Sequence, residues 1–566
     1  MSEQDVKQEL RYDFDWIVVG SGFGGSVAAL RLAQKGYSVA LLEAGPRMRD
    51  QDFAKTAWNL RRTFWAPGLG LRGISRVSVF KDIFIASGAG VGGGSLVYAN
   101  TLYRAKPSFF AHPQWQGMED WESLLQPHYA TAERMLGVKT VPWSSDGQTL
   151  LQELGEHFGV GQTFTRTPCG VFFGEAGLSV PDPYFGGSGP ERTGCTRCGG
   201  CTSGCRVGAK NTLVKNYLWF AEEQGVQVLA QTEVSDLRPL DGGEGLTGYA
   251  VDTVYPGAWL RKRARTLRAR GVVIAAGALG TNALLARCKH GGGLPRLSDS
   301  LGVLVRTNSE SILAVTLPDD TLQPARDVSI SASVHLNHDT HIELVSYGAK
   351  ADALKFFFTL LTGEGSRLTR PMLLLGQVVR HPWRFLKSLS PLHWARRTLI
   401  LLVMQSRDNA ITFVPKRRWF GGIGLSTQQD SGKPNPTFIA EGNAAAAWLA
   451  QRTGGIAQSM VPEALANIPT TAHILGGAVI GRDASSGVVN GQGQVFGYQN
   501  LLICDGSVMP ANPGVNPSLT ITALAEHIMS RIPCAPDFER VQEVSNDAPP
   551  QCGGRVLLRS SGTPVL

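Results

Sequence analysis

The first 45 residues show a buried strand, a helix and a second buried strand, in that order. Residues 14–19 (FDWIVV) are a short apolar run rich in β-branched residues, typical of a strand buried in a parallel sheet. Residues 26–36 (SVAALRLAQKG) repeat apolar positions at helical spacing, and residues 38–45 (SVALLEAG) predict a second buried strand. This order is that of the first unit of a doubly wound α/β domain.

A glycine-rich turn joins the first strand to the helix. Gly20, Gly22 and Gly25 form G-x-G-x-x-G directly after the strand, and Glu43 closes the second strand 23 residues after Gly20. The first glycine permits a tight turn, the second lets backbone approach a pyrophosphate, and the third lets helix and strand pack closely. Glu43 is placed to accept a hydrogen bond from a ribose hydroxyl. The pattern predicts a dinucleotide site without distinguishing FAD from NAD.

Glycine also dominates residues 86–101 (ASGAGVGGGSLVYANT). Such a run cannot form a regular strand or helix, and it offers bare backbone N–H groups to a ligand. Apolar residues flank it on both sides, so we expect a buried loop. Further along, residues 225–237 (GVQVLAQTEVSDL) read as strand, and residues 271–286 (GVVIAAGALGTNALLA) read as strand, glycine turn and helix.

The composition is that of a folded chain with three or four domain-sized units. The 566 residues are 43% hydrophobic and 18% charged, which excludes intrinsic disorder. No uncharged apolar run reaches the roughly 18–20 residues of a membrane-spanning helix. The net charge of +8 permits anionic partners. No zinc-finger or RNA-binding aromatic motif accompanies it, so we expect no nucleic-acid partner.

The beginning of the chain and its cysteines favour a reducing compartment. MSEQDVKQEL has acids where a signal peptide carries positive charge before an apolar stretch. Nine cysteines are too few for a disulfide scaffold of this length. We therefore expect a cytoplasmic protein.

Four of the cysteines fall within eleven residues. Cys195, Cys198, Cys201 and Cys205 are spaced C-x2-C-x2-C-x3-C, as in bacterial ferredoxins but without the trailing proline. Three interpretations stay open: a [4Fe-4S] cluster, a zinc site with four thiolate ligands, and thiols that stabilise a loop without metal. Zinc sites usually pair two C-x2-C units across a longer spacer. A cluster would carry electrons to a quinone or redox protein.

Six segments together resemble the glucose–methanol–choline (GMC) flavin oxidoreductases, and within them the bacterial cholesterol oxidase branch. They occur in family order from residue 18 to about residue 530, and the last is the most specific. They are VVGSGFGGSVAALRLAQKG, GAGVGGGSLVYANT, KNTLVKNYL, VVIAAGALGTNALL, HILGGAVIG and LLICDGSVMPANPGVNPSLTITALAEHI.

The resemblance implies a doubly wound, Rossmann-like FAD-binding domain and a discontinuous α+β substrate domain. The FAD-binding domain would comprise residues 12–104, 190–305 and 465–533. The substrate domain would comprise residues 105–189 and 306–464. A polar tail would occupy residues 534–566.

The resemblance also implies which residues contact FAD. Val234 would contact adenine, Gly93, Gly94 and Asn100 the flavin, and Asp505 and Gly506 would close the pyrophosphate end. Thr101, Gly277 and Ser518 complete the implied cofactor contacts. Tyr98 stands where the branch usually carries asparagine.

The same resemblance places His473 and Asn516 at the flavin face as the catalytic pair. Oxidising an alcohol needs hydride to leave carbon for flavin N5 while the hydroxyl loses its proton. A histidine accepts or positions that proton, and an asparagine amide donates to the oxygen as charge builds. Ile474 replaces the family's usual proline. HWARR, where isomerising members carry a glutamate, holds no acid. Glu343 is the nearest acid by pattern, but a structural role in its strand explains it as well, so we expect simple oxidation.

Residues 350–397 combine basic and apolar character. They carry nine Lys or Arg and two acids, with apolar runs such as LKFFFTLL and MLLLGQVV. Amphipathic helices interrupted at Pro371 and Pro382 would suit peripheral contact with a membrane. An ordinary helix pair with a solvated basic face explains the pattern equally well.

These observations favour an FAD-dependent oxidoreductase that converts a lipophilic alcohol to a ketone or aldehyde, with a cluster passing electrons to an acceptor other than oxygen. The alternatives are an oxidase that uses O2 without a cluster, an NAD-dependent dehydrogenase, and an electron-transfer or redox-sensing flavoprotein without an alcohol substrate.

Overall fold

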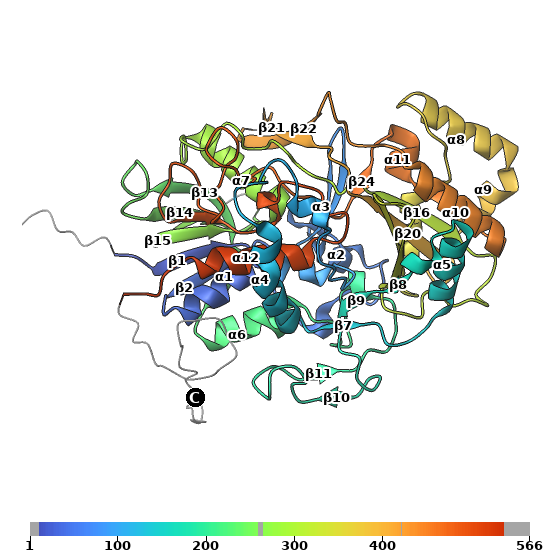
Figure 1. Cartoon of the computed structure of the whole chain (residues 1–566), viewed down its shortest axis with the longest axis horizontal. Helices are drawn as coiled ribbons and strands as arrows, with labels where there is room; N and C mark the ends of the chain where they lie inside the picture. The colour runs from blue at the N-terminus through green and yellow to red at the C-terminus, as the bar shows by residue number, and fades with distance from the viewer. Residues whose placement is uncertain (1–10, 259–263, 420, 537–566) are drawn as a thin grey trace, which may run out of the picture.

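The computed structural model describes residues 11–258, 264–419 and 421–536 (Figure 1). Two seven-stranded sheets form its framework. The predicted polar tail lies almost entirely outside the described residues, as do the first ten residues. Within the described part of the chain, no helix has the length and apolar character needed to cross a membrane.

The first sheet is a doubly wound sheet with an antiparallel extension. Its parallel part contains β12 (Gln227–Leu229), β2 (Val39–Leu42), β1 (Phe14–Val19), β15 (Ala264–Ile274) and β25 (Leu501–Ile503). β14 (Tyr249–Val254) and β13 (Glu233–Pro239) extend it antiparallel from the first half of β15. The predicted doubly wound α/β architecture is confirmed.

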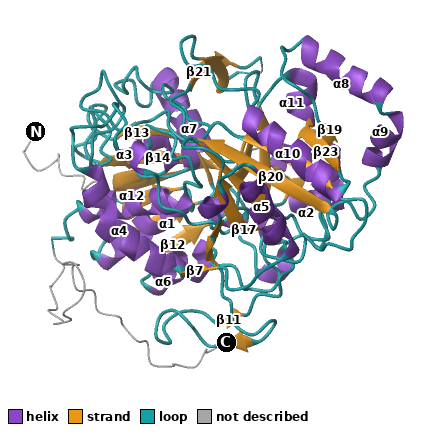
Figure 2. Cartoon of the chain, turned by 45° about the vertical axis from the view of Figure 1, so that its right-hand side comes forward, coloured by secondary structure: helices purple, strands orange, loops and turns teal. Residues whose placement is uncertain are grey.

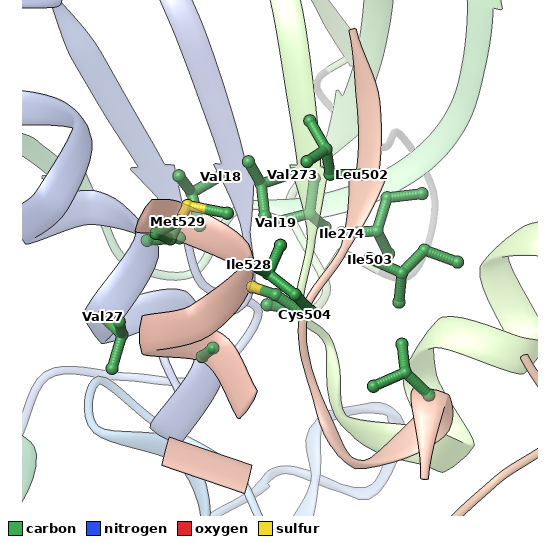
Figure 3. Close-up of a cluster of buried hydrophobic side chains, with 14 of the residues drawn as sticks. Val18, Val19, Val27, Val273, Ile274, Leu502, Ile503, Cys504, Ile528 and Met529 are labelled. Carbon is green, nitrogen blue, oxygen red and sulfur yellow. The ribbon is translucent and has the colours of Figure 1, made fainter. Parts of the chain in front are cut away.

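Apolar strand residues join this sheet to the helices beside it. Helix α1 (Phe23–Gln34) follows the glycine turn and packs between the sheet and α12 (Ser518–Ser530). α4 (Trp121–Leu136) covers α12, and α6 (Tyr217–Glu223) packs on α1. The residues labelled in Figure 3 come from β1, β15, α1, α12 and the segment of β25 with the following Cys504. They are far apart in sequence, yet they belong to one buried cluster. Burial of this surface fixes the strand ends that carry the glycine loops.

The second sheet is wholly antiparallel. In order it contains β19 (Phe358–Leu360), β23 (Ile456–Met460), β16 (Ser311–Thr316), β20 (Thr398–Gln405), β18 (Thr340–Val345), β17 (Ile330–His335) and β8 (Thr165–Arg166). Helices α5 (Asp146–His157) and α10 (Ala440–Thr453) cover one of its faces.

Strand β20 shows how this sheet presents two apolar faces. Leu399, Leu401 and Val403 pack in the cluster with α5 and α10. The alternate residues Ile400 and Leu402 pack in a separate cluster on the opposite face. Because side chains alternate along a strand, a continuous apolar run supplies both a helix-covered face and a second face free to line a cavity.

Two expectations about elements need correction. The run 225–237 is not one strand: β12 and β13 lie at opposite edges of the first sheet, because the chain turns at Gln231, which has φ +54°. Pro371 does not interrupt a helix, since it lies in the first turn of α8 (Thr369–Arg380), where a backbone N–H would have no partner within the helix. Pro382 does begin a new helix, α9 (Pro382–Leu389).

Candidate functional site

A cavity of about 820 Å³ lies between the two sheets. One wall consists of the loops at the carboxyl ends of β1, β2 and β15, where ligands bind in doubly wound folds. The opposite wall is the second face of the antiparallel sheet, with Ile312, Ile330, Val345, Ile400 and Leu402. The cavity is therefore polar and glycine-rich on one side and apolar on the other.

The structure brings most of the predicted site residues to this cavity. Both predicted catalytic residues line it, as do the predicted cofactor contacts Gly20, Gly22, Glu43, Gly93, Gly94, Thr101, Val234, Gly277, Asp505, Gly506 and Ser518. Gly25 and Asn100 are not among its lining residues. The predicted residues among its lining span nearly 500 positions of the chain, from Gly20 to Ser518.

The two glycine-rich loops touch each other backbone to backbone. A Cβ on Gly93 would lie 2.6 Å from the Cα of Gly22, and Gly93 has φ +51°. A Cβ on Gly22 itself would have no protein atom within 4 Å, although Gly22 lines the cavity at the N-cap of α1. An open backbone surface at a helix N-terminus fits a pyrophosphate, because unpaired N–H groups and the helix dipole favour negative charge.

Gly25 and Asn100 serve differently from the lining residues. A Cβ on Gly25 would lie 1.8 Å from the carbonyl oxygen of Gly20, so this glycine lets helix and strand pack closely. Asn100 is buried with φ +68°, and neither polar atom of its side chain has a hydrogen-bond partner among the described residues.

Glu43 ties the two loops together. Its carboxylate accepts hydrogen bonds from the Ser21 backbone N–H at 3.1 Å and the Ser21 hydroxyl at 2.7 Å. It also accepts from the N–H groups of Gly45 at 2.8 Å and Gly90 at 3.3 Å. This predicted ribose contact is thus also a structural clamp between the loops.

Asp505 performs a similar task at the start of α7 (Gly277–Gly291). Its carboxylate accepts from the Gly277 N–H at 2.8 Å and the Thr281 hydroxyl at 2.5 Å. The Ser507 N–H and hydroxyl donate to its other oxygen at 2.8 and 2.6 Å. Asp505 therefore fixes two segments of the cavity wall relative to each other.

His473 lies just after β24 (Thr470–Thr471), where its ring meets a buried carboxylate. Its Nδ1 contacts Oε1 of Glu310, and the other Glu310 oxygen accepts from the Ala472 N–H at 2.7 Å. Burial opposes protonation of the imidazole, but the Glu310 carboxylate outweighs burial and raises the pKa of His473. The contact orients the ring and leaves Nε2 for a substrate.

Asn516 is held by a second buried acid. Its Nδ2 donates to Oε2 of Glu343 at 3.1 Å, while the Asn516 carbonyl oxygen has no partner among the described residues. Burial raises the pKa of Glu343 to about 8. The Glu310 carboxylate and His473 also act on Glu343 electrostatically, and Glu343 in turn acts on His473, so the two held residues share one electrostatic environment.

Pattern reasoning missed Glu310 and left Glu343 between a site acid and a structural residue of its strand. Glu310 directly precedes β16, and Glu343 lies in β18, on the same face of the strand as the lining residue Val345. A carboxylate within an apolar strand run is the available sequence signal, because acids are rarely buried without a partner. The partner becomes visible only in the folded chain.

The four predicted metal ligands surround one small cavity of about 20 Å³, together with Lys210 and Asp327. The cysteines are free thiols. Among the described residues, however, no group of three or more His, Cys, Asp or Glu side chains is arranged to hold a metal ion. The predicted iron–sulfur cluster and the zinc alternative are therefore not supported by the structure.

Comparisons with known proteins agree with this geometry. The family model for the FAD binding domain matches residues 15–297, and the model for GMC oxidoreductase matches residues 440–525. A cholesterol oxidase of Mycobacterium tuberculosis is 47% identical, covering 94% of this chain and 93% of its own. A cholesterol oxidase of Acinetobacter baumannii is 44% identical, covering 93% and 96%.

Among solved structures, pyridoxine 4-oxidase from Mesorbium loti has the same fold. It aligns with a TM-score of 0.58 at 15% identity, covering 91% of this chain and 98% of its own.

Proposed function

The chain belongs to the GMC flavin oxidoreductases and is an FAD-dependent alcohol oxidoreductase, and we propose that it oxidises a lipophilic, sterol-like alcohol to the ketone with O2 as the electron acceptor. One observation carries the substrate class: the cavity wall that faces the glycine loops is an apolar sheet face, with His473 and Asn516 on the same cavity. The names of the relatives at 44–47% identity support the choice of a sterol and of oxygen.

Bound FAD would supply the acceptor for the hydride of the carbinol carbon. The predicted contacts would hold it as follows: Gly22 and the start of α1 at the pyrophosphate, Glu43 at the ribose, Val234 at adenine, and Gly93 and Gly94 at the flavin. The open backbone at Gly22 fits this assignment, because only a ligand atom would meet a side chain there.

Side chains of the protein would accept the hydroxyl proton and stabilise the negative charge that builds on the substrate oxygen. His473 takes the hydroxyl proton, and Glu310 stabilises the resulting imidazolium, as the raised pKa of His473 indicates. Asn516 keeps one amide hydrogen on Glu343 and offers the other to the substrate oxygen. The proton leaves from the O–H bond and the hydride from the C–H bond of the same carbinol group, so the carbonyl product remains.

The test is anaerobic reduction followed by air. Cholesterol added to the purified yellow protein without oxygen should bleach the flavin absorbance, and air should restore it with formation of hydrogen peroxide. Reduction by short polar alcohols but not by the sterol would overturn the substrate class. Product analysis in the same assay should include the double-bond position, because Glu343 places an acid beside Asn516.

Electron transfer through a cluster is the second candidate. The four thiols are not arranged as metal ligands among the described residues, but they line one small cavity. Thr202 and Ser203, which follow Cys201, line the large cavity, so a cluster at the thiols would lie near the flavin site. Iron and acid-labile sulfide are assayed on anaerobically purified protein. About four irons per chain, with flavin that air reoxidises slowly, would replace oxygen by a quinone or protein acceptor. Flavin without iron, rapidly reoxidised by air, would support oxygen.

A further inference from the structure

Helices α8 and α9 carry an apolar face that no described part of the chain covers. Trp383 is 76% exposed, Val379 73%, Met372 70% and Leu375 63%. The three α8 residues follow the spacing i, i+3, i+7, so they share one side of the helix. Both views place this helix pair at an edge of the molecule (Figures 1 and 2).

This exposed face is additional to the face that holds the helices in place. Leu374, Val378 and Phe385 pack against Leu360 and Ala464. The helices therefore have their core contact already, and a surface helix needs only one apolar stripe for that. Large apolar residues grouped on an open surface, here extending to Leu386 and Leu389, mark an interaction site.

The charge around the face selects the partner. Neither helix contains an acid, while Arg380, Arg384 and Lys387 are exposed. The chain as a whole has a net charge of +8, so a second copy would bring like charge to this basic surface. An anionic lipid surface offers opposite charge at its headgroups and apolar depth beneath them, and Trp383 suits the boundary between the two.

We propose that the exposed face of α8 and α9 docks the enzyme on an anionic lipid bilayer, with Met372, Leu375, Val379 and Trp383 in the interface and the basic side chains at the headgroups. The helices lie parallel to the membrane rather than across it. This inference is independent of the alcohol, since it rests on the surface alone. Of the two interpretations that the sequence of residues 350–397 left open, the exposed apolar face favours membrane contact.

Vesicle co-sedimentation of the FAD-loaded protein tests the proposal. The vesicles contain no sterol and are either phosphatidylcholine alone or phosphatidylcholine with about a third phosphatidylglycerol. We expect binding to the anionic vesicles that high salt weakens. The double variant Leu375→Gln/Trp383→Gln should lose at least about tenfold in partitioning, and Arg384→Gln/Lys387→Gln about fivefold per charge.

A matched control separates the face from general surface hydrophobicity. Leu246 is also largely exposed, at the turn between β13 and β14, and Leu246→Gln should bind vesicles like the parent. Turnover of detergent-dispersed substrate by each variant checks that the fold is retained. Equal vesicle binding by the parent and the α8–α9 variants would overturn the proposal. So would parent protein that ignores vesicles but dimerises through this face, as sedimentation velocity would show.

Discussion

The two walls of the large cavity bind and react by different means. The wall on the first sheet is made of backbone: Gly22 and Gly93 approach each other so closely that a Cβ on Gly93 would lie 2.6 Å from the Cα of Gly22. The wall on the second sheet is apolar, and buried carboxylates behind the reacting face, Glu310 and Glu343, hold His473 and Asn516. Recognition by backbone imposes glycine at fixed spacings, whereas recognition by paired side chains imposes no local pattern.

The largest expected effect tests the backbone wall. Gly25→Val should yield no FAD-containing protein, because the Cβ would meet the Gly20 carbonyl oxygen at 1.8 Å. Gly22→Ala should leave the apoprotein as stable as the parent but weaken FAD binding by about 10–100-fold, since its Cβ meets only the ligand. Flavin absorbance and thermal unfolding with and without FAD measure both variants. Parent-like FAD affinity in Gly22→Ala would refute the assignment of Gly22 to the cofactor.

The next largest effect tests the side chains held by the buried carboxylates. His473→Ala should lower kcat by about 10²–10⁴-fold, the usual contribution of a positioned acid or base, with flavin content unchanged. The exposed His338 provides the matched control, and His338→Ala should turn over like the parent. A kcat for His473→Ala within about threefold of the parent would show that His473 is not the base in the reaction.

The difference between the walls explains how much the sequence could predict. The run 14–19 forms β1, and the apolar pattern that follows it forms α1. Most of the cofactor contacts that the resemblance implies, from Gly20 to Ser518, line one cavity. These features are local, or occur in a fixed order along the chain. The predicted strand boundaries were wrong where contacts with distant parts of the chain determine them. At Gln231, a left-handed backbone conformation separates β12 from β13.

What the sequence could not predict depends on contacts between distant segments. Glu310 and His473 are 163 positions apart, and Asn516 and Glu343 are 173 apart. No periodicity links such pairs, because their proximity follows from the packing of the two sheets. The four cysteines show that a local pattern can also mislead. Their ferredoxin-like spacing predicted a metal site, and the thiols do line one cavity, but among the described residues they are not arranged as metal ligands.

A third prediction concerns how the buried acids change the free energy of unfolding with pH. Glu343 has its pKa raised to about 8 from an ordinary 4.5, so the folded state holds its proton more tightly than the unfolded state. Stability should therefore fall as pH rises between these values, by about 3 kcal/mol from pH 5 to 8. Glu343→Gln should flatten this fall in denaturant unfolding.

Glu463 is the control for that experiment. Burial raises its pKa to about 7, and its carboxyl accepts from the Ser311 hydroxyl rather than from a catalytic residue. Glu463→Gln should flatten part of the stability profile without changing the pH profile of kcat, whereas Glu343→Gln should change both. Unaltered stability profiles in both variants would show that neither acid holds a proton in the folded chain at neutral pH.

The smallest effect separates charge from orientation at His473. Glu310→Gln keeps a side chain that can accept from the imidazole but removes the negative charge that raises the pKa of His473. A neutral imidazole acts as the base, so activity rises with pH through this pKa, and the rising limb of kcat/KM should move to lower pH in the variant. The loss of kcat should be only about tenfold, because Gln still orients the ring. Glu310→Ala removes orientation as well and should lose more. If Glu310→Gln loses kcat about tenfold but the rising limb of kcat/KM stays at the same pH, Glu310 only positions His473. The carboxylates beside the second sheet would then contribute geometry rather than charge to the reaction.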